Sequence, residues 1–279
     1  MIISIASGKG GTGKTTVAVN LALSLGNQVQ YLDCDVEEPN GHIFIKPEFQ
    51  KSVTVGTPIP EVNKSKCTYC GKCGEICQYN AIVVIKNNVL VFPELCHSCA
   101  GCWLVCPENA ISPIDRELGI IEQGKNGGVE FIHGKLRIGE AMSPPLIRKV
   151  KSEIDSNKTV IIDAPPGTSC PVIESVKKSD FVLLVTEPTP FGLNDLKLAV
   201  EMIRTLKLPF GLVINRSDVG NDDVRLYCKE EKIDILLEIK NDRKIAEAYS
   251  RGTSMVEIYP EYRTKFQELY HEIERRAGA

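Results

Sequence analysis

The sequence of 279 residues is 43% hydrophobic and 25% charged, and its 33 basic and 36 acidic residues give a net charge of −3. This is the composition of a globular protein, and it excludes the disordered, collagen-like and membrane-spanning classes. No long basic run is present, so we expect neither nucleic acid nor an anionic membrane surface as a partner. The apolar runs are strand-length, well short of the roughly 18 residues that a spanning helix needs, so membrane insertion is not expected.

The first residues, MIISIASGKGG, have no basic start and no long apolar region, so a cytoplasmic location is expected. Cysteine is the unusual component, because eight of the eleven cysteines fall between Cys67 and Cys106. An odd number of cysteines without a secretory signal argues against a disulfide framework and indicates metal chemistry in a reducing compartment.

Residues 1–57 begin an alternating α/β order. The run IISIA predicts a short strand, a glycine-rich segment follows, and residues 15–25 then carry valine and leucine at helical spacing. A second short strand is predicted at 29–32. Strand, loop, helix and strand form a βαβ unit, which implies a parallel sheet.

Residues 58–115 differ in character and are predicted to form a compact module inserted into the first domain. They hold both cysteine arrays, and a hairpin is predicted between 81–85 and 89–92. The arrays recur with an offset of 29 residues, each followed by Asn-Ala-Ile. This internal duplication indicates one repeated unit.

From residue 116 the α/β order resumes. A hairpin is predicted within 119–139, and helices alternate with strands at 159–163, 181–185, 210–214 and 233–237. We therefore predict one doubly wound, mostly parallel sheet built from residues 1–57 and 116–279.

A glycine-rich segment from Gly8 to Thr15 matches the phosphate-binding loop pattern and lies between a predicted strand and a predicted helix. Its glycines let successive backbone N–H groups turn toward phosphates, and the helix N-terminus adds its positive dipole end. Lys14 would supply charge to the β- and γ-phosphates, and Thr15 a hydroxyl to Mg²⁺. The pattern alone also fits a plain glycine-rich turn.

Polar residues after the predicted strands strengthen the nucleotide interpretation. Asp33 and Asp35 follow the second strand, Asp163 ends the run VIID, and Asn215 follows FGLVI. An acid at the carboxyl end of a strand beside the loop is where a magnesium-coordinating aspartate belongs. Each residue alone is more typical of a cap or turn, but together with the loop they predict a site for ATP and Mg²⁺.

The segment GKGGTGKTT, with a second lysine at Lys9, resembles the deviant Walker A motif of the MinD/ParA-type ATPases. That group also includes the nitrogenase iron protein and the Mrp/Nbp-type iron–sulfur cluster carriers. Residues 33–40 resemble its switch I and residues 163–169 its switch II, so the resemblance covers about 1–45 and 130–275. It implies a MinD-like P-loop NTPase fold and an ATP hydrolase.

The resemblance implies roles for individual residues. Lys9 would reach across a nucleotide-sandwich homodimer to the partner's phosphates, and Asp35 would orient or activate the attacking water. Asp33 would support the metal shell, Asp163 would hold Mg²⁺ through water, and Asn215 would read adenine. The expected catalytic residues are Lys9, Lys14 and Asp35, and those expected to bind ATP or ADP are Gly8, Lys9, Gly10, Gly11, Thr12, Gly13, Lys14, Thr15, Thr16 and Asn215. The expected Mg²⁺ residues are Thr15, Asp33 and Asp163.

The chain also departs from that pattern on the base side. Residues 239–242 read Ile-Lys-Asn-Asp, where many relatives have a run that contains a proline. The contacts to the base are therefore less well defined by the resemblance than those to the phosphates.

The two cysteine arrays share the spacing C-x2-C-x2-C-x3-C. This spacing resembles bacterial two-cluster ferredoxins, in which the fourth cysteine of each array ligates the other cluster. The resemblance implies a small α+β ferredoxin-like domain with two [4Fe–4S] clusters, one held by Cys67, Cys70, Cys73 and Cys106, the other by Cys96, Cys99, Cys102 and Cys77. Zinc is the alternative, but it usually takes two separated cysteine pairs. Gln78 replaces the proline that usually follows, which predicts only a different local turn.

Three cysteines lie outside the arrays. Cys34 and Cys228 are interpreted as small buried hydrophobes. Cys170 lies seven residues after Asp163, at the offset where the nitrogenase iron protein places one ligand of its intersubunit cluster. No cysteine occurs from 107 to 169 to supply the second ligand, so a third cluster is disfavoured.

Three functions fit this combination. The first is an ATPase that couples nucleotide binding and hydrolysis to electron transfer or metallocofactor maturation, acting on a client protein or a related ATPase paralogue. The second is an ATP-dependent iron–sulfur cluster carrier or assembly scaffold. The third is a MinD-like spatial organiser that docks through the ferredoxin module, and it is weakest because the tail has mixed charge and lacks a basic membrane helix. Complete cysteine ligation favours stable, electron-carrying clusters and therefore the first function.

Overall fold

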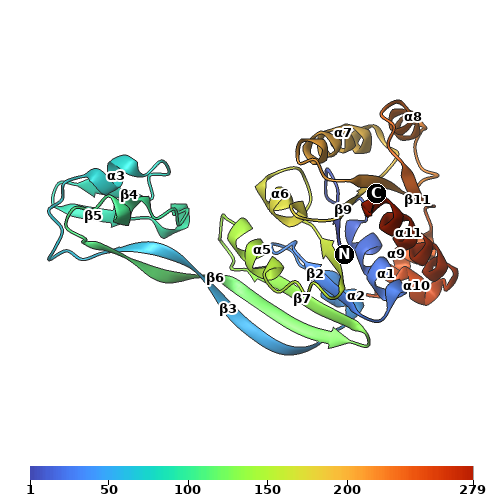
Figure 1. Cartoon of the computed structure of the whole chain (residues 1–279), viewed down its shortest axis with the longest axis horizontal. Helices are drawn as coiled ribbons and strands as arrows, with labels where there is room; N and C mark the ends of the chain where they lie inside the picture. The colour runs from blue at the N-terminus through green and yellow to red at the C-terminus, as the bar shows by residue number, and fades with distance from the viewer. Residues whose placement is uncertain (279) are drawn as a thin grey trace.

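The computed structural model describes residues 1–278, and its main body is a nine-stranded sheet from which a long ribbon carries a smaller unit (Figure 1). The strand order is β11-β10-β9-β1-β8-β2-β7-β6-β3. The strands are β1 Ile2–Ala6, β2 Val29–Asp33, β3 Glu48–Val62, β6 Ile111–Asn126, β7 Val129–Leu136, β8 Thr159–Asp163, β9 Phe181–Thr186, β10 Phe210–Asn215 and β11 Ile235–Ile239. All neighbours from β11 to β7 are parallel, whereas β6 and β3 continue the sheet in antiparallel pairing.

The mostly parallel sheet is therefore confirmed, and most predicted strands are close to their places. The strand predicted at 233–237 is wrong at its start, because β11 begins two residues later. Ile233 donates its N–H to the carbonyl of Cys228 at the end of the preceding helix, which delays the strand. The predicted hairpin within 119–139 is formed by β6 and β7, with Gly127 at a positive φ of 54° in its turn.

Helices cover both faces of the sheet. One face carries α1 Lys14–Leu25, α2 Gly41–Ile45, α10 Met255–Ile258 and α11 Glu261–Ala277, and the other carries α5 Pro144–Lys151, α6 Cys170–Val176, α7 Pro190–Thr205 and α8 Asp223–Glu230. The short α9 Arg243–Tyr249 packs beside α10. Both faces of the sheet are apolar and need helices packed against them, as strand β9 shows. Its residues alternate between two cores, with Phe181, Leu183 and Val185 in one and Val182 and Leu184 in the other.

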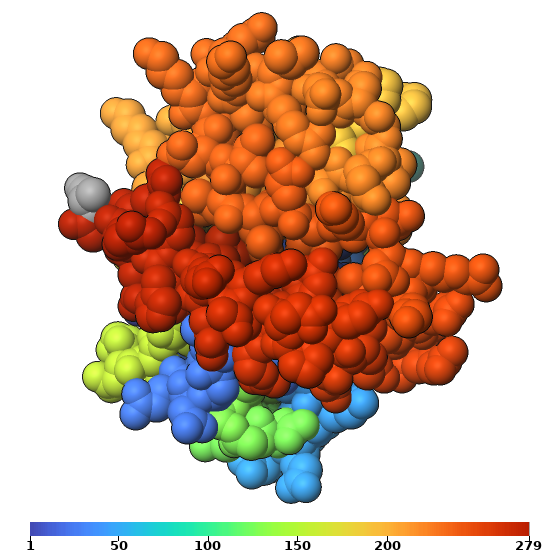
Figure 2. All heavy atoms as spheres, turned by 90° about the vertical axis from the view of Figure 1, so that its right-hand side faces the viewer, coloured from blue at the N-terminus to red at the C-terminus, as the bar shows by residue number. Residues whose placement is uncertain are grey.

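The last helix, α11, is docked on the main body. Phe266, Leu269 and Ile273 lie on one side of it, are buried, and pack in the same core as α1. Figure 2 shows this helix, in red, lying across the face of the molecule turned to the viewer. The apolar side of the tail is thus used inside the domain. No helix within residues 1–278 has both the length and the apolar character needed to cross a bilayer.

The ribbon of β3 and β6 was not foreseen as an extension of the sheet. Its outer strand begins with residues 48–54, which are all exposed and carry no clear apolar alternation. Beyond the ribbon, residues 63–110 form a unit with its own two-stranded sheet, β4 Ile82–Ile85 and β5 Asn88–Val91, which is the predicted hairpin. This unit also contains α3 Lys72–Ile76, a 3-10 helix at Pro93–Leu95 and α4 Gly101–Leu104.

Where the ribbon joins the main body, aromatic rings pack around one buried imidazole. His133 on β7 is fully buried, stacks on Phe49 at 5.3 Å and meets Phe131 edge-on at 5.1 Å. Its Nε2 lies 2.9 Å from the Glu122 carboxylate. Burial outweighs the carboxylate and lowers the pKa of His133 to about 4.

We predict that His133 makes the fold sensitive to acid. Its folded pKa lies below the ordinary value of 6.5, so the unfolded chain takes up the proton first and stability falls as the pH drops through that window. The expected loss between pH 7 and 5.5 is about 1 kcal/mol. Urea unfolding of wild type and His133→Gln at both pH values measures it, with the exposed His271→Gln as control. Equal acid losses in wild type and His133→Gln would contradict this assignment.

Candidate functional site

The phosphate-loop segment connects β1 to α1, as its pattern predicts. Gly11 and Gly13 have positive φ values of 81° and 93°, and α1 begins immediately afterwards at Lys14. Gly8 and Gly13 are also required by close packing, since a Cβ at Gly8 would collide with the backbone of Asp195 and one at Gly13 with the amide of Asn215. The loop backbone is thereby fixed by neighbours from α7 and β10.

The loop forms one wall of a cavity of about 380 Å³. Asp35, Glu38 and Asn40 line it from the segment after β2, and Pro166 lines it from the segment after β8. The remaining wall comes from the ends of β10 and β11 and from α9 and α10. These segments meet because the carboxyl ends of parallel strands lie along one edge of the sheet. Of the predicted loop residues, Gly10, Gly11, Gly13, Lys14, Thr15 and Thr16 line the cavity.

Asp163 lies beneath this cavity in a buried position. It accepts a hydrogen bond from the hydroxyl of Tyr31 at 3.0 Å, while its Oδ1 is buried without a partner among the described residues. Burial raises the pKa of Asp163, and Lys14 and the Thr15 hydroxyl oppose that rise. Mg²⁺ prefers oxygen ligands, so an unpaired carboxylate oxygen beside a lysine and a hydroxyl is suited to a site that binds a magnesium nucleotide.

Asp33 has a different environment from the one that the resemblance implies. Its carboxylate accepts backbone N–H groups from Asp35, Asn40 and Gly41 at 3.2, 3.1 and 2.9 Å. It is fully buried and does not line the cavity. Both oxygens are therefore engaged in shaping the segment that follows β2, and burial raises the pKa of this carboxyl well above its usual range.

Asp35 follows β2 and is partly buried. Its carboxyl lines the cavity together with Lys14. Burial and the nearby charge of Asp163 raise its pKa to about 6, while Lys14 pulls the pKa down. An acid tuned toward neutrality is suited to orient a water or accept its proton.

Asn215 makes two hydrogen bonds within the protein that the sequence did not reveal. Its Nδ2 donates to the Thr12 carbonyl at 2.9 Å, and its Oδ1 accepts the N–H of Arg216 at 3.0 Å. Asn215 therefore holds the phosphate loop in place, and one donor and one acceptor position of its side chain are not used by these two bonds. Lys9 is partly exposed and does not line the cavity of its own chain.

Two residues of the site were missed in the sequence. Tyr31 lies inside the predicted strand, and only its hydroxyl in an otherwise apolar run signalled a buried hydrogen bond. Tyr249 on α9 lines the cavity and packs on Phe44 of α2, with 4.5 Å between ring centroids. No motif marks Tyr249, because α9 reaches the site only through tertiary packing.

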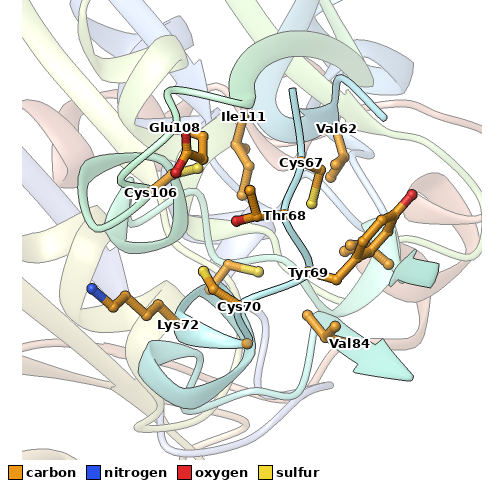
Figure 3. A pocket seen from close by; sticks show the side chains of 13 residues that line it. Val62, Cys67, Thr68, Tyr69, Cys70, Lys72, Val84, Cys106, Glu108 and Ile111 are labelled. Carbon is orange, nitrogen blue, oxygen red and sulfur yellow. The ribbon is translucent and has the colours of Figure 1, made fainter. Parts of the chain in front are cut away.

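The cysteines of the smaller unit line two separate cavities. Cys67, Cys70 and Cys73 of the first array surround one cavity together with Cys106 of the second (Figure 3). Cys96, Cys99 and Cys102 line the other together with Cys77. No group of three or more His, Cys, Asp or Glu side chains within residues 1–278 is placed to hold a single metal ion. Each array thus sends its fourth cysteine to the cavity of the other.

The two cavities have matching surroundings, as a duplicated sequence predicts. Cys73 and Cys102 are buried, whereas Cys70 and Cys99 are exposed. The sulfur of Cys77 accepts the N–H of Ala81 at 3.3 Å, and the sulfur of Cys106 accepts that of Ala110 at the same distance.

The cysteines outside the arrays lie in the main body. Cys34 and Cys228 are buried, in agreement with their interpretation as small hydrophobes, and burial raises the pKa of both thiols. Cys170 is exposed at the first residue of α6.

Comparisons with known proteins agree with this architecture. The family model described as the CobQ/CobB/MinD/ParA nucleotide binding domain matches residues 3–255. An uncharacterised protein of Methanocaldococcus jannaschii is 37% identical over 226 residues, which cover 79% of this chain and 80% of that protein. An iron–sulfur cluster carrier protein of the same organism is 25% identical over 290 residues, covering 97% and 83%. The septum site-determining protein MinD of Pyrococcus horikoshii, solved with Mg-ADP, matches with a TM-score of 0.62 at 20% identity, covering 99% and 97%.

The fold and the phosphate loop define a MinD/ParA-type P-loop ATPase, for which a nucleotide with Mg²⁺ fits the cavity. The chain belongs to the CobQ/CobB/MinD/ParA nucleotide-binding family and has iron–sulfur carrier homologues.

We predict that Lys14→Ala abolishes nucleotide binding, because Lys14 is the one buried cation in the wall of the cavity, within the described residues. The expected loss of affinity for Mg-ADP is on the order of 100-fold or more, measured by calorimetry. Lys265→Ala on α11 serves as the control. Unchanged affinity in Lys14→Ala would mean that the phosphates bind elsewhere.

We predict that Asp35→Ala binds ATP but does not turn it over. Removing this carboxyl leaves the loop intact and takes away the group nearest to an attacking water. Phosphate release and nucleotide binding, measured on the same preparation, separate the two effects, and the exposed neighbour Glu37→Ala is the control. Normal hydrolysis by Asp35→Ala would disprove the switch I assignment.

Proposed function

We propose that this ATPase carries two [4Fe–4S] clusters in residues 58–115, and that nucleotide binding and hydrolysis in residues 1–57 and 116–279 control electron transfer or metallocofactor maturation. The observation that carries the proposal is the exchange of fourth cysteines between the two cavities. A two-cluster ferredoxin needs this crossed set of thiolates, whereas two independent zinc sites do not.

The donor sets suit cubane clusters in their chemistry. Each cavity offers four thiolates and an apolar lining, with Val62, Val84 and Val89 in the first and Ile76, Ala81 and Trp103 in the second. Backbone N–H groups that point at cysteine sulfurs, as at Cys77 and Cys106, are among the features that set cluster potentials. When bound, such clusters would accept and donate single electrons. One exposed cysteine in each set, Cys70 and Cys99, leaves a side open to a redox partner.

In the nucleotide site, Lys14 and Thr15 would bind the phosphates and Mg²⁺, and Asp163 would hold Mg²⁺ through water. Asp35 would orient the attacking water. Asp33 would support the metal site indirectly, since its carboxylate organises the segment that carries Asp35. Phosphoryl transfer depends on positioning and positive charge, which is the chemistry that these groups supply.

Lys9 would act in a nucleotide-sandwich homodimer. Its partial exposure and its place outside the cavity of its own chain agree with a lysine that reaches the partner's phosphates. Asn215, already bonded to the loop, would keep its remaining donor and acceptor for adenine.

An ATP-dependent carrier or assembly scaffold for iron–sulfur clusters is the second candidate. It is favoured by similarity to an iron–sulfur cluster carrier protein over 97% of this chain and 83% of that protein, and by the exposed thiol of Cys170 beside the segment that resembles switch II. Complete ligation in both cavities favours clusters that stay in place. A spatial organiser is less well supported, since the apolar side of α11 is buried.

We predict that paired substitutions reveal the crossed ligation. Cys67→Ser/Cys106→Ser removes two ligands of one cluster, so iron is expected to fall from about eight to about four atoms per chain. Cys67→Ser/Cys77→Ser removes one ligand from each cluster and should impair both. Iron analysis and EPR after anaerobic reconstitution test this, with Cys170→Ser as the matched control that retains all iron. Loss of both clusters in the first pair would contradict the crossed arrangement.

We predict that nucleotide binding shifts a cluster potential if electron transfer is the function. A redox titration followed by EPR, with and without a non-hydrolysable ATP analogue, measures the shift. A change of about 60 mV in a one-electron potential corresponds to a coupling of about 1.4 kcal/mol. ATP-driven delivery of clusters to an apo-acceptor, with no shift, would favour the carrier instead.

A further inference from the structure

We propose that Arg116 is a positioning residue that links the nucleotide-sensing segment after β2 to the segment that carries Cys96 and Cys99. The inference rests on the proposed function, and it goes beyond it in naming the route and in assigning the response to the second cluster rather than the first. The route consists of direct contacts that lead from the segment after β2 through β7 and the ribbon to Glu94 and Ser98.

The first contact joins the segment after β2 to the end of β7. The carbonyl of Val36, next to Asp35, accepts the N–H of Leu136 at 2.8 Å. Val36 is buried, and its side chain lies so close to Gly134 that a Cβ there would crowd it. A displacement of Asp35 that carries Val36 with it must therefore move or break the end of β7.

The second contact joins β7 to the ribbon. Arg137 follows Leu136 and donates its N–H to the Leu118 carbonyl of β6 at 2.9 Å. The turn that starts at Arg137 brings Glu140 back toward the ribbon. The carboxylate of Glu140 is almost fully buried, and its Oε1 lies 2.5 Å from Nη2 of Arg116. The charge of Arg116 is thus held by the turn that follows β7.

The third contact joins the ribbon to the smaller unit. The guanidinium of Arg116 also lies 4.0 Å from the carboxylate of Glu94, two residues before Cys96. Thr57 is the cross-strand partner of Arg116, and its hydroxyl is 2.7 Å from that of Ser98. Both strands of the ribbon therefore touch the same short segment at the same register position.

Two further features distinguish the contacts around Arg116 from contacts that only stabilise the ribbon. The ladder of β3 and β6 shifts register between Val55 and Gly56, next to Thr57, so the ribbon has a bulge there. In addition, Nε and Nη1 of Arg116 and Oε2 of Glu140 are buried without hydrogen-bond partners among the described residues. A buried pair with unmet hydrogen bonds is weak evidence for a stabilising role, and such unsatisfied groups need another explanation, for example stored strain.

Among the described residues, the contacts made at Arg116 and Thr57 lead to the second cysteine cavity, whereas the far ends of the ribbon, Val62 and Ile111, line the first. Glu94 and Ser98 flank Cys96, which lines the second cavity. The N–H of Ser98 also lies 3.5 Å from the sulfur of Cys96. Movement of Arg116 would therefore reposition a hydrogen-bond donor of the second cluster, while residues 67–73 have no such contact with the ribbon clamp formed by Thr57, Glu94, Ser98, Arg116 and Glu140.

Backbone hydrogen exchange on the cluster-loaded full chain tests this link. With Mg²⁺ and a non-hydrolysable ATP analogue, we expect exchange over 93–103 to change by at least about fivefold, the lower range of allosteric couplings, and exchange over 67–77 to stay constant. Arg116→Met should lose the response at 93–103 and keep both ATP hydrolysis and iron content. Glu94→Gln, at an exposed position that cannot unfold the core, should weaken the same response.

Arg204→Met is the matched control, since it removes an exposed arginine–glutamate pair on α7 and should keep the full response. A wild-type response that survives in both Arg116→Met and Glu94→Gln, or a wild type that does not respond at 93–103, overturns the proposal. Because backbone exchange needs no cluster, a cluster-free sample tests the link as well. Iron content and EPR report on the proposed function separately, so the two failures are distinguishable.

Discussion

Three neighbouring carboxylates, two of them beside the buried Lys14, are the constraint on which the nucleotide site depends. Asp33, Asp35 and Asp163 gather at the carboxyl edge of the parallel sheet, and burial raises the pKa of each. Lys14 alone cannot balance them. A Mg²⁺ ion bound beside Asp163 would add positive charge there, although a magnesium nucleotide as a whole is anionic, so metal binding and the ionisation of these acids would be coupled.

The three carboxylates differ in their hydrogen-bond partners. Asp163 retains an unpaired oxygen toward the site, whereas both oxygens of Asp33 are bonded to the backbone of the segment that holds Asp35. Any shift of Asp35 on nucleotide binding would therefore act on a backbone already tied to Asp33 and, by way of Val36, to β7. The segment after β2 is thus hydrogen-bonded to β7, the strand that pairs with the ribbon strand β6.

The ribbon distinguishes this chain from a plain nucleotide-binding domain. Figure 1 shows β3 and β6 extending the sheet away from the helices and carrying the cysteine unit at their far end. The cysteine cavities are thus remote from the phosphates, and direct contact between a bound nucleotide and a cluster in one chain is excluded. Any coupling must pass through the ribbon or through a partner that touches both parts, which is why the contacts at Arg116 matter for either proposed function.

The sequence by itself determined the elements whose signals are local. Short segments of the sequence are enough to predict three features, because each has a strict local requirement. These features are the phosphate loop, the apolar strands β1, β8, β9 and β10, and the spacing of the cysteine arrays. Tertiary structure alone decided the rest. Residues 48–54 of β3 are exposed and have no apolar period, the cavity wall at Tyr249 comes from a distant helix, and the carboxylate of Asp33 turns to the backbone because Asn40 and Gly41 fold back onto it. These features depend on contacts between residues far apart in the chain or on backbone geometry, which no local pattern encodes.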